Sequence, residues 1–223
     1  MLKAIIFDFN GTLFNDSALH EKAWILMAKK LREKPLEIEE FYEHLQGRDN
    51  IQITSYLLGY EPDAESAEAI AEEKEALYRK ICKSPEGVHK LANGAESFLD
   101  TVKNARTPIA IATGSYLPNV QFYFDLLNLE RWFSMDRVVF DDGTYPGKPA
   151  PDVYLKACKT IDVQPVECLV FEDSYAGVSS ANSAGIGRIV TVEPRLIPQK
   201  LVELGGVYKM INGFTQADLS LLK

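Results

Sequence analysis

Groups of polar residues follow apolar segments of this sequence, and a lysine lies in a loop between two of the groups. The residues are Asp8 and Asn10, then Thr113, Gly114 and Ser115, then Lys148, and finally Glu172 and Asp173. Carboxylates that lie close together repel one another unless a cation or a positively charged side chain neutralises them. Hard carboxylate oxygens suit Mg²⁺, which typically binds a few protein carboxylates together with a substrate phosphate. If the fold brings these residues together, they could hold a metal ion and a phosphate group.

The remaining polar residues suit the phosphate. We expect Thr113 and the backbone amides after it to open a helix, where an anion is favoured. Lys148 would supply a positive point charge both to the phosphate and to the group that attacks it as a nucleophile. Each short motif also has an ordinary interpretation, as a helix cap for Thr113 or Glu172 and as a solvated lysine for Lys148. Their order and their placement after predicted strands favour one joint site.

The apolar run at residues 4–7 predicts the strand around which this site is built. An unbroken run of this kind is typical of a buried strand in a parallel sheet. Gly11 then allows the chain to turn, so that Asp8 lies at the carboxyl end of the strand, where open α/β sheets build their sites. The alternative is a hairpin, because Asn10-Gly11 between apolar runs is also a strong turn signal.

The other elements divide the chain into a helical part and an alternating part. Helical spacing predicts helices at residues 17–32, 38–45, 51–58 and 62–81, with no strand evident between 14 and 84. Strands are then predicted at 108–112, 137–140, 168–171 and 187–192, and helices at 94–102, 119–127, 151–161 and 175–184. This pattern predicts an α/β fold, a Rossmann-like doubly wound parallel sheet. We expect a core domain of residues 1–14 and 85–223, with an inserted all-helical domain at 15–84. Residues 196–222 are expected to add mixed elements that the sequence does not assign individually.

Composition limits the partners and the location of the protein. The chain has 223 residues, 46% of them hydrophobic, and a formal net charge of -8. This charge disfavours nucleic acids and anionic membranes as partners. Cys82, Cys158 and Cys168 show no metal spacing, and we expect buried free thiols in a reducing compartment. Without a signal-like N-terminus or a long apolar run, we expect a cytoplasmic protein, a monomer or weak dimer.

The four polar groups resemble the four motifs of the haloacid dehalogenase-like hydrolase superfamily, over essentially the whole chain. The matching segments are residues 7–13, 111–115, 147–152 and 171–174. This resemblance, to the branch of β-phosphoglucomutase-like enzymes and phosphatases with a helical cap, implies that Asp8 is a nucleophile that forms an aspartyl-phosphate. It implies that Asp8, Asp173 and the backbone carbonyl of Asn10 hold Mg²⁺, with Glu172 beside them. It also implies that Thr113, with Gly114 and Ser115, binds phosphate.

Two residues of the helical insert resemble substrate-facing residues of that cap. His20 lies in a segment similar to β-phosphoglucomutases, and Arg48 lies in a segment that resembles the cap loop. Arg48 is therefore a candidate contact for a phosphate or a sugar. The alternative for His20 is packing within the cap.

Asn10 departs from the family pattern, which usually has an aspartate there as the general acid and base. An amide can orient a leaving group but cannot deliver a proton at neutral pH. We therefore expect a Mg²⁺-dependent phosphohydrolase of a small phosphorylated metabolite, slow unless its leaving group needs little protonation. Two alternatives remain: β-phosphoglucomutase-like transfer, if Asn10 is engineered or deamidated, and a low-activity binding or regulatory protein. A metal-free dehalogenase is disfavoured because the acids call for a cation.

Overall fold

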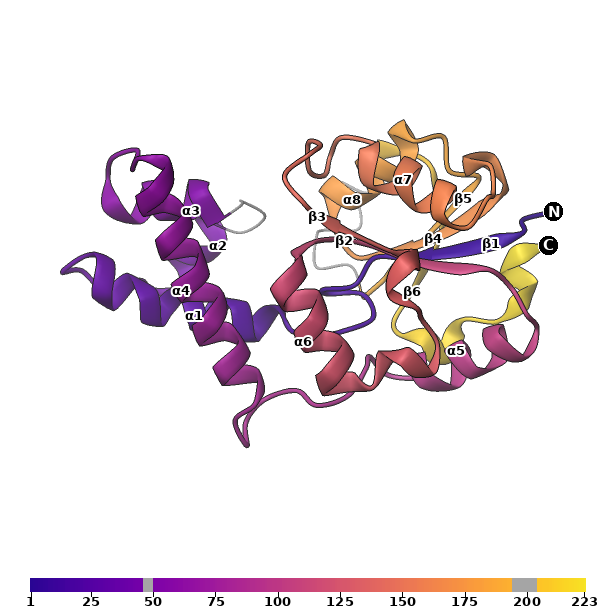
Figure 1. Cartoon of the computed structure of the whole chain (residues 1–223), viewed down its shortest axis with the longest axis horizontal. Helices are drawn as coiled ribbons and strands as arrows, with labels where there is room; N and C mark the ends of the chain where they lie inside the picture. The colour runs from indigo at the N-terminus through magenta and orange to yellow at the C-terminus, as the bar shows by residue number, and fades with distance from the viewer. Residues whose placement is uncertain (46–49, 194–203) are drawn as a thin grey trace. The chain divides into compact units, whose positions relative to one another are not determined.

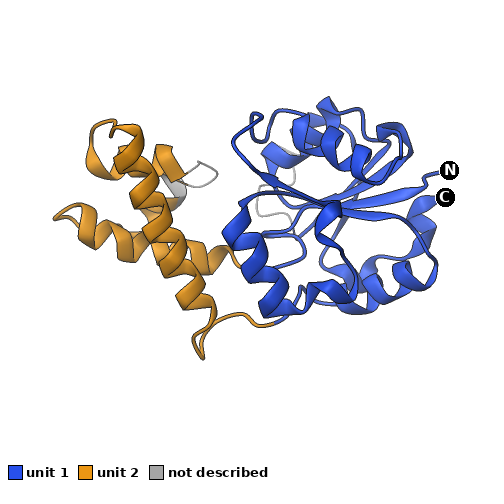
Figure 2. Cartoon of the chain, viewed as in Figure 1, with its two compact units in different colours: residues 1–15, 90–223 blue, residues 16–89 orange. Residues whose placement is uncertain are grey.

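The computed structural model of the protein describes residues 1–45, 50–193 and 204–223, with only the backbone of residues 42 and 43. The chain forms two compact units, one of residues 1–15 with 90–223 and one of residues 16–89 (Figure 2). The second unit begins and ends slightly later than the insert expected at 15–84. The chain thus leaves the first unit after a single strand and returns to it for the rest of the sheet.

The first unit contains, in the part of the chain that the structure describes, a six-stranded parallel sheet in the order β3-β2-β1-β4-β5-β6 (Figure 1). The strands are β1 (Ala4–Phe7), β2 (Ile109–Tyr116), β3 (Val138–Asp141), β4 (Cys168–Glu172), β5 (Arg188–Val192) and β6 (Val207–Ile211). Ile5 of β1 lies opposite Ile109 of β2 and Leu169 of β4. Because both neighbours of β1 are parallel to it, the hairpin alternative at Asn10-Gly11 is wrong.

Helices cover both faces of this sheet, which confirms the predicted doubly wound α/β fold. α7 (Asp152–Thr160) and α8 (Tyr175–Ser183) lie on one side, and α5 (Ala95–Asn104) and α6 (Leu117–Leu127) on the other (Figure 1). Ile6 packs with α7 and α8 in one apolar cluster. Phe7 points the other way, where its ring contacts Phe98 of α5 at a centroid distance of 6.3 Å. The strand is buried on both faces, and this is why its sequence is apolar without alternation.

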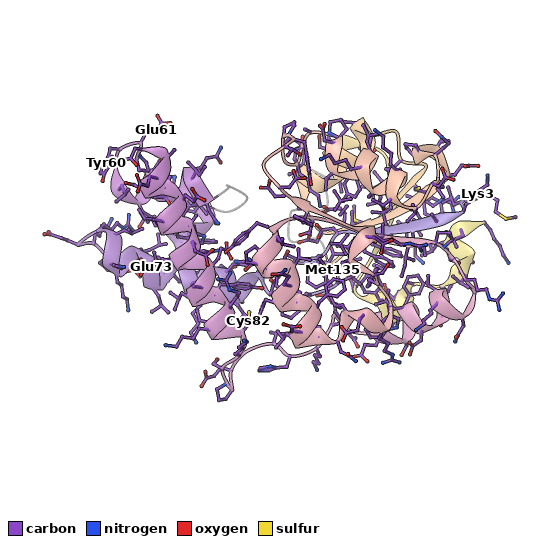
Figure 3. The ribbon with its side chains drawn as sticks, viewed as in Figure 1. Lys3, Tyr60, Glu61, Glu73, Cys82 and Met135 are labelled. Atoms are coloured by element: carbon purple, nitrogen blue, oxygen red, sulfur yellow. The ribbon has the colours of Figure 1, made fainter. Side chains whose placement is uncertain are left out.

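The second unit is a bundle of α1 (Ser17–Leu31), α2 (Ile38–His44), α3 (Asn50–Leu58) and α4 (Ala64–Cys82). Its apolar core includes Trp24 and Met27 of α1 and Leu57 of α3. On the surface, Lys30 of α1 forms an ion pair of 2.5 Å with Glu73 of α4, which Figure 3 labels. Apolar helix faces therefore hold this unit together, as the helical spacing predicted.

Strand β2 is longer than the sequence predicted. Thr113, Gly114 and Ser115 belong to the strand, and α6 begins only at Leu117. Glycine and serine resemble a turn in sequence, but here they form an irregular stretch of the strand, between the β3 pairing of Ala112 and that of Tyr116. The expectation that Thr113 opens a helix, and the phosphate argument based on it, are wrong.

The structure also orders part of the tail, where β6 pairs with β5. Cys82, Cys158 and Cys168 are buried free thiols, as predicted; Cys82 is labelled in Figure 3.

Among the described helices, none combines the length and the apolar character needed to cross a membrane.

Candidate active site

Asp8 lies directly after the central strand β1. Its backbone N–H donates to the carbonyl of Phe171 in β4 at 3.0 Å, so the chain still follows the sheet at this point. Gly11 then has a φ of +84°, a conformation that residues with a side chain rarely adopt. The Asp8 side chain is almost completely buried at this edge of the sheet.

Lys148 lies between two buried carboxylates. Its Nζ is 2.6 Å from Asp8 Oδ1 and 2.5 Å from Glu172 Oε1. Tyr154 of α7 donates its hydroxyl to the same Glu172 oxygen at 3.1 Å, and its ring centre lies 5.0 Å from the Lys148 ammonium. Lys148 is therefore the cation that offsets the repulsion between Asp8 and Glu172.

Glu172 is held by the start of helix α8. Its Oε2 accepts the backbone N–H groups of Asp173 and Ser174, both at 2.8 Å, and the Ser174 hydroxyl at 3.0 Å. A Cβ on Gly177 would lie 1.6 Å from Glu172 Oε1, so a glycine is required for the helix to pass this close. Both oxygens of Glu172 thus have hydrogen-bond partners, and one of them contacts Lys148.

Asp8, Glu172 and Asp173 together could hold a metal ion. One oxygen of each lies within 4.8 Å of the others. Asp8 Oδ2 is buried and has no hydrogen-bond partner among the described residues. Asp173 Oδ1 accepts the Thr12 hydroxyl at 3.2 Å, and the carboxylate packs so closely on Gly11 that a Cβ there would lie 2.2 Å from Oδ2. A buried oxygen without a partner, in a set of hard oxygen donors, fits Mg²⁺.

Burial and neighbouring charges shift the protonation of Asp8 and Lys148. Burial raises the pKa of Asp8 to about 7, Lys148 opposes this shift, and Glu172 adds to it. Burial lowers the pKa of Lys148, but attraction to Asp8 and Glu172 outweighs it, and the pKa lies well above its ordinary value. Lys148 therefore stays charged at neutral pH, whereas full ionisation of Asp8 there requires a further positive charge beside it.

The Asn10 side chain contacts β2 and α6. Its Oδ1 accepts the hydroxyls of Ser115 at 2.8 Å and Thr113 at 3.2 Å, and its Nδ2 donates to the Tyr123 hydroxyl at 2.9 Å. Gly114, between the two hydroxyl residues, is exposed, with no heavy atom within 4 Å of a Cβ built there. The structure thus brings Thr113 and Ser115 to Asn10, and no helix N-terminus is involved.

The two candidates from the helical insert belong to the second unit. The His20 ring stacks on Tyr78 at a centroid distance of 3.7 Å, and its Nδ1 lies 2.7 Å from Lys74 Nζ. Lys74 also forms an ion pair of 2.7 Å with Glu75. These contacts agree with the packing alternative for His20, and its contact with a substrate stays a prediction. Arg48 lies outside the described residues.

Sequence reasoning missed several residues of this site. They are Thr12, Tyr123, Tyr154 and Gly177. Tyr123 and Tyr154 occupy core-facing positions of helices, where a tyrosine and a phenylalanine give the same apolar pattern. A buried tyrosine usually finds a partner for its hydroxyl, and this was the signal that could have identified both.

Comparisons with known proteins show the family. A family model for haloacid dehalogenase-like hydrolases matches residues 2–185. A phosphorylated carbohydrates phosphatase from Thermotoga maritima is 32% identical over 211 residues, which cover 92% of this chain and 93% of that protein.

Solved structures are similar over the whole length. A hydrolase from Entamoeba histolytica, described as family IA, variant 3, is 39% identical, covers 99% of this chain and 97% of its own, and has a TM-score of 0.92. A mutant of CbbY from Rhodobacter sphaeroides, in which an asparagine replaces an aspartate, was crystallised with xylulose-1,5-bisphosphate; it is 26% identical, with full coverage of both chains and a TM-score of 0.83.

Proposed function

Because the chain belongs to the haloacid dehalogenase-like hydrolases, we propose that it is a Mg²⁺-dependent phosphohydrolase with Asp8 as its nucleophile. The observation that carries this proposal is the environment of Asp8. Its Oδ1 is held by Lys148, its Oδ2 has no partner among the described residues, and Asp173 lies beside it. The substrate is a small phosphorylated metabolite, such as a sugar phosphate. The name of the Thermotoga relative, a phosphatase of phosphorylated carbohydrates, supports this class.

The reaction has two displacement steps. An Asp8 carboxylate oxygen attacks phosphorus and the ester P–O bond breaks, which leaves a phosphoryl group on Asp8 and an alkoxide that takes up a proton. Water then attacks phosphorus, the bond to Asp8 breaks, and inorganic phosphate forms. Lys148 favours the ionised form of Asp8 before the attack and orients its carboxylate. Mg²⁺, held by Asp8, Asp173 and the backbone carbonyl of Asn10, would supply positive charge to the phosphate oxygens.

Asn10 sets the range of substrates that react quickly. An amide has no proton to give to the departing oxygen and accepts none from the attacking water. An alkyl phosphate needs that help, whereas an aryl or acyl phosphate, whose leaving oxygen is a weak base, needs it much less. Activated phosphates are therefore the better substrates, and hydrolysis of phosphorylated Asp8 also proceeds without a base at this position.

Asn10 also favours a second candidate function. A protein with this phosphate site but without an acid and base could bind a phosphorylated metabolite and act as a regulator, with little turnover. The first candidate predicts phosphate release, and the second predicts binding alone.

The two candidates differ in a screen of phosphorylated metabolites and aryl phosphates in Mg²⁺, with phosphate release as the readout. Asp8→Ala should abolish release, while Asp142→Asn, in an exposed loop where Thr144 holds the carboxylate, should leave it unchanged. Undiminished release in EDTA would contradict the metal assignment. Binding of a metabolite without release of phosphate from any compound would favour the second candidate.

A further inference from the structure

Asn10, Ser115 and Tyr123 close a ring of hydrogen bonds. Asn10 Nδ2 donates to the Tyr123 hydroxyl at 2.9 Å, and the Ser115 hydroxyl donates to Asn10 Oδ1 at 2.8 Å. The hydroxyls of Ser115 and Tyr123 lie 3.3 Å apart. Because Ser115 uses its hydrogen for Asn10, Tyr123 is the donor in this last contact. Each side chain of the ring thus both donates and accepts, an arrangement in which hydrogen bonds strengthen one another.

The ring of hydrogen bonds is fixed from outside by aromatic packing. Tyr123 is 1% exposed, and its ring stacks on Phe9 at a centroid distance of 4.7 Å. Phe14 contacts the same ring edge-on at 5.8 Å. The tyrosine hydroxyl cannot shift without moving these rings. It therefore provides a rigid reference point for the amide of Asn10.

The oxygen of the amide is fully engaged by the hydroxyls of β2. Oδ1 accepts from Thr113 as well as from Ser115, which uses both lone pairs of this oxygen. Any hydrogen bond from this side chain to a substrate is therefore donated by Nδ2 and not accepted by Oδ1.

We propose that Tyr123 is a positioning residue that acts through Asn10: with Ser115, it fixes the amide so that Asn10 meets the substrate as a hydrogen-bond donor. This inference rests on the proposed function and refines its substrate class. A donor suits a departing oxygen that leaves without a proton, as in an aryl or acyl phosphate. It does not suit a substrate hydroxyl that must give up a hydrogen.

A double-mutant cycle separates this role from simple packing. Tyr123→Phe keeps the aromatic contacts and removes the hydroxyl. With p-nitrophenyl phosphate in Mg²⁺, it should lower kcat about threefold to tenfold, the effect of one lost hydrogen bond, with little change in KM. In an Asn10→Ala background the same substitution should change kcat by less than about twofold, because Tyr123 then has no amide to position. The control is Tyr145→Phe, which removes a hydroxyl that donates to the Phe140 carbonyl and should leave kcat unchanged.

A second readout needs no substrate. In protein labelled with ¹⁵N at asparagine, the side-chain amide signal that Asn10→Ala removes should exchange its hydrogens with water about threefold to tenfold faster after Tyr123→Phe. Unchanged exchange, or an equal loss of kcat in both backgrounds, would overturn the inference. If no phosphate compound is hydrolysed by the natural sequence, the proposed function fails, while the exchange measurement still decides whether Tyr123 holds the amide.

Discussion

Replacement of Lys148 by methionine should destabilise the first unit strongly. Methionine keeps most of the side-chain volume and removes the ammonium group from between Asp8 and Glu172, whose side chains are 9% and 0% exposed. Loss of one partner from a buried ion pair costs about 3–5 kcal/mol. For a chain of this size each kcal/mol lowers Tm by about 2–4 °C, so we expect a decrease of about 6–20 °C.

The assay is thermal unfolding at pH 7 in EDTA, with Lys156→Met as the matched control. The Lys156 ammonium lies 3.7 Å from Asp142, in a pair whose side chains are 39% and 41% exposed. A surface pair of this kind contributes about 0–1 kcal/mol, so the control should change Tm by a few degrees at most.

Mg²⁺ provides a further test of the same reasoning. Because it would replace part of the lost positive charge, it should raise the Tm of Lys148→Met more than that of the natural sequence. A Tm of Lys148→Met within about 2 °C of the natural value in EDTA would refute the argument. It would show that the ammonium group does not stabilise the two buried carboxylates.

Other substitutions test the site and the helical unit separately. Asn10→Asp should raise kcat for alkyl sugar phosphates by up to about 10² to 10⁴, and raise it less for an aryl phosphate; equal rates before and after would mean that another group supplies the proton. Gly11→Ala should weaken Mg²⁺ binding about tenfold or more, because the added Cβ would displace the Asp173 carboxylate. The binding is measured by calorimetry, and an unchanged affinity would exclude Asp173 as a ligand. Arg32 holds the pKa of Glu40 down to about 2, below its ordinary 4.5, so this contact stabilises the fold above pH 4.5 and is lost as the pH falls towards 2. Glu40→Gln should therefore lower the free energy of unfolding in urea by about 1 kcal/mol at pH 7, a difference that should disappear near pH 2.

The sequence predicted the fold and the site best where a buried strand ends at a residue that can take part in chemistry. A run of apolar residues that stops at a carboxylate predicted both the central strand β1 and the position of Asp8, since only a strand buried on both faces lacks alternation. The sequence around Lys148 is a weaker signal of a site than the sequence around Asp8. Nothing local distinguishes a lysine between two carboxylates from a solvated one, and its position was inferred from the order of the motifs.

Other features depend on residues far away in sequence. Gly114 and Ser115 lie in β2 between Ala112 and Tyr116, which both pair with β3, and local propensity for a turn gives no sign of that neighbouring strand. Tyr123 meets Asn10 only because α6 packs against the loop after β1, 113 positions away. Such contacts follow from the tertiary fold, which single-residue patterns do not encode.

The order of the strands has a consequence for synthesis of the protein on the ribosome. Ile6 pairs with Ala110 and with Val170, so the strand that leads to the nucleophile is made long before either partner. At about 5–20 residues per second, Val170 is added about 10–30 seconds after Ile6. The helices of residues 16–89 make mostly local contacts and can form during this interval, whereas pairing of β1 raises the contact order and slows folding. A nascent chain therefore carries this apolar strand without either partner for about the first half of its synthesis.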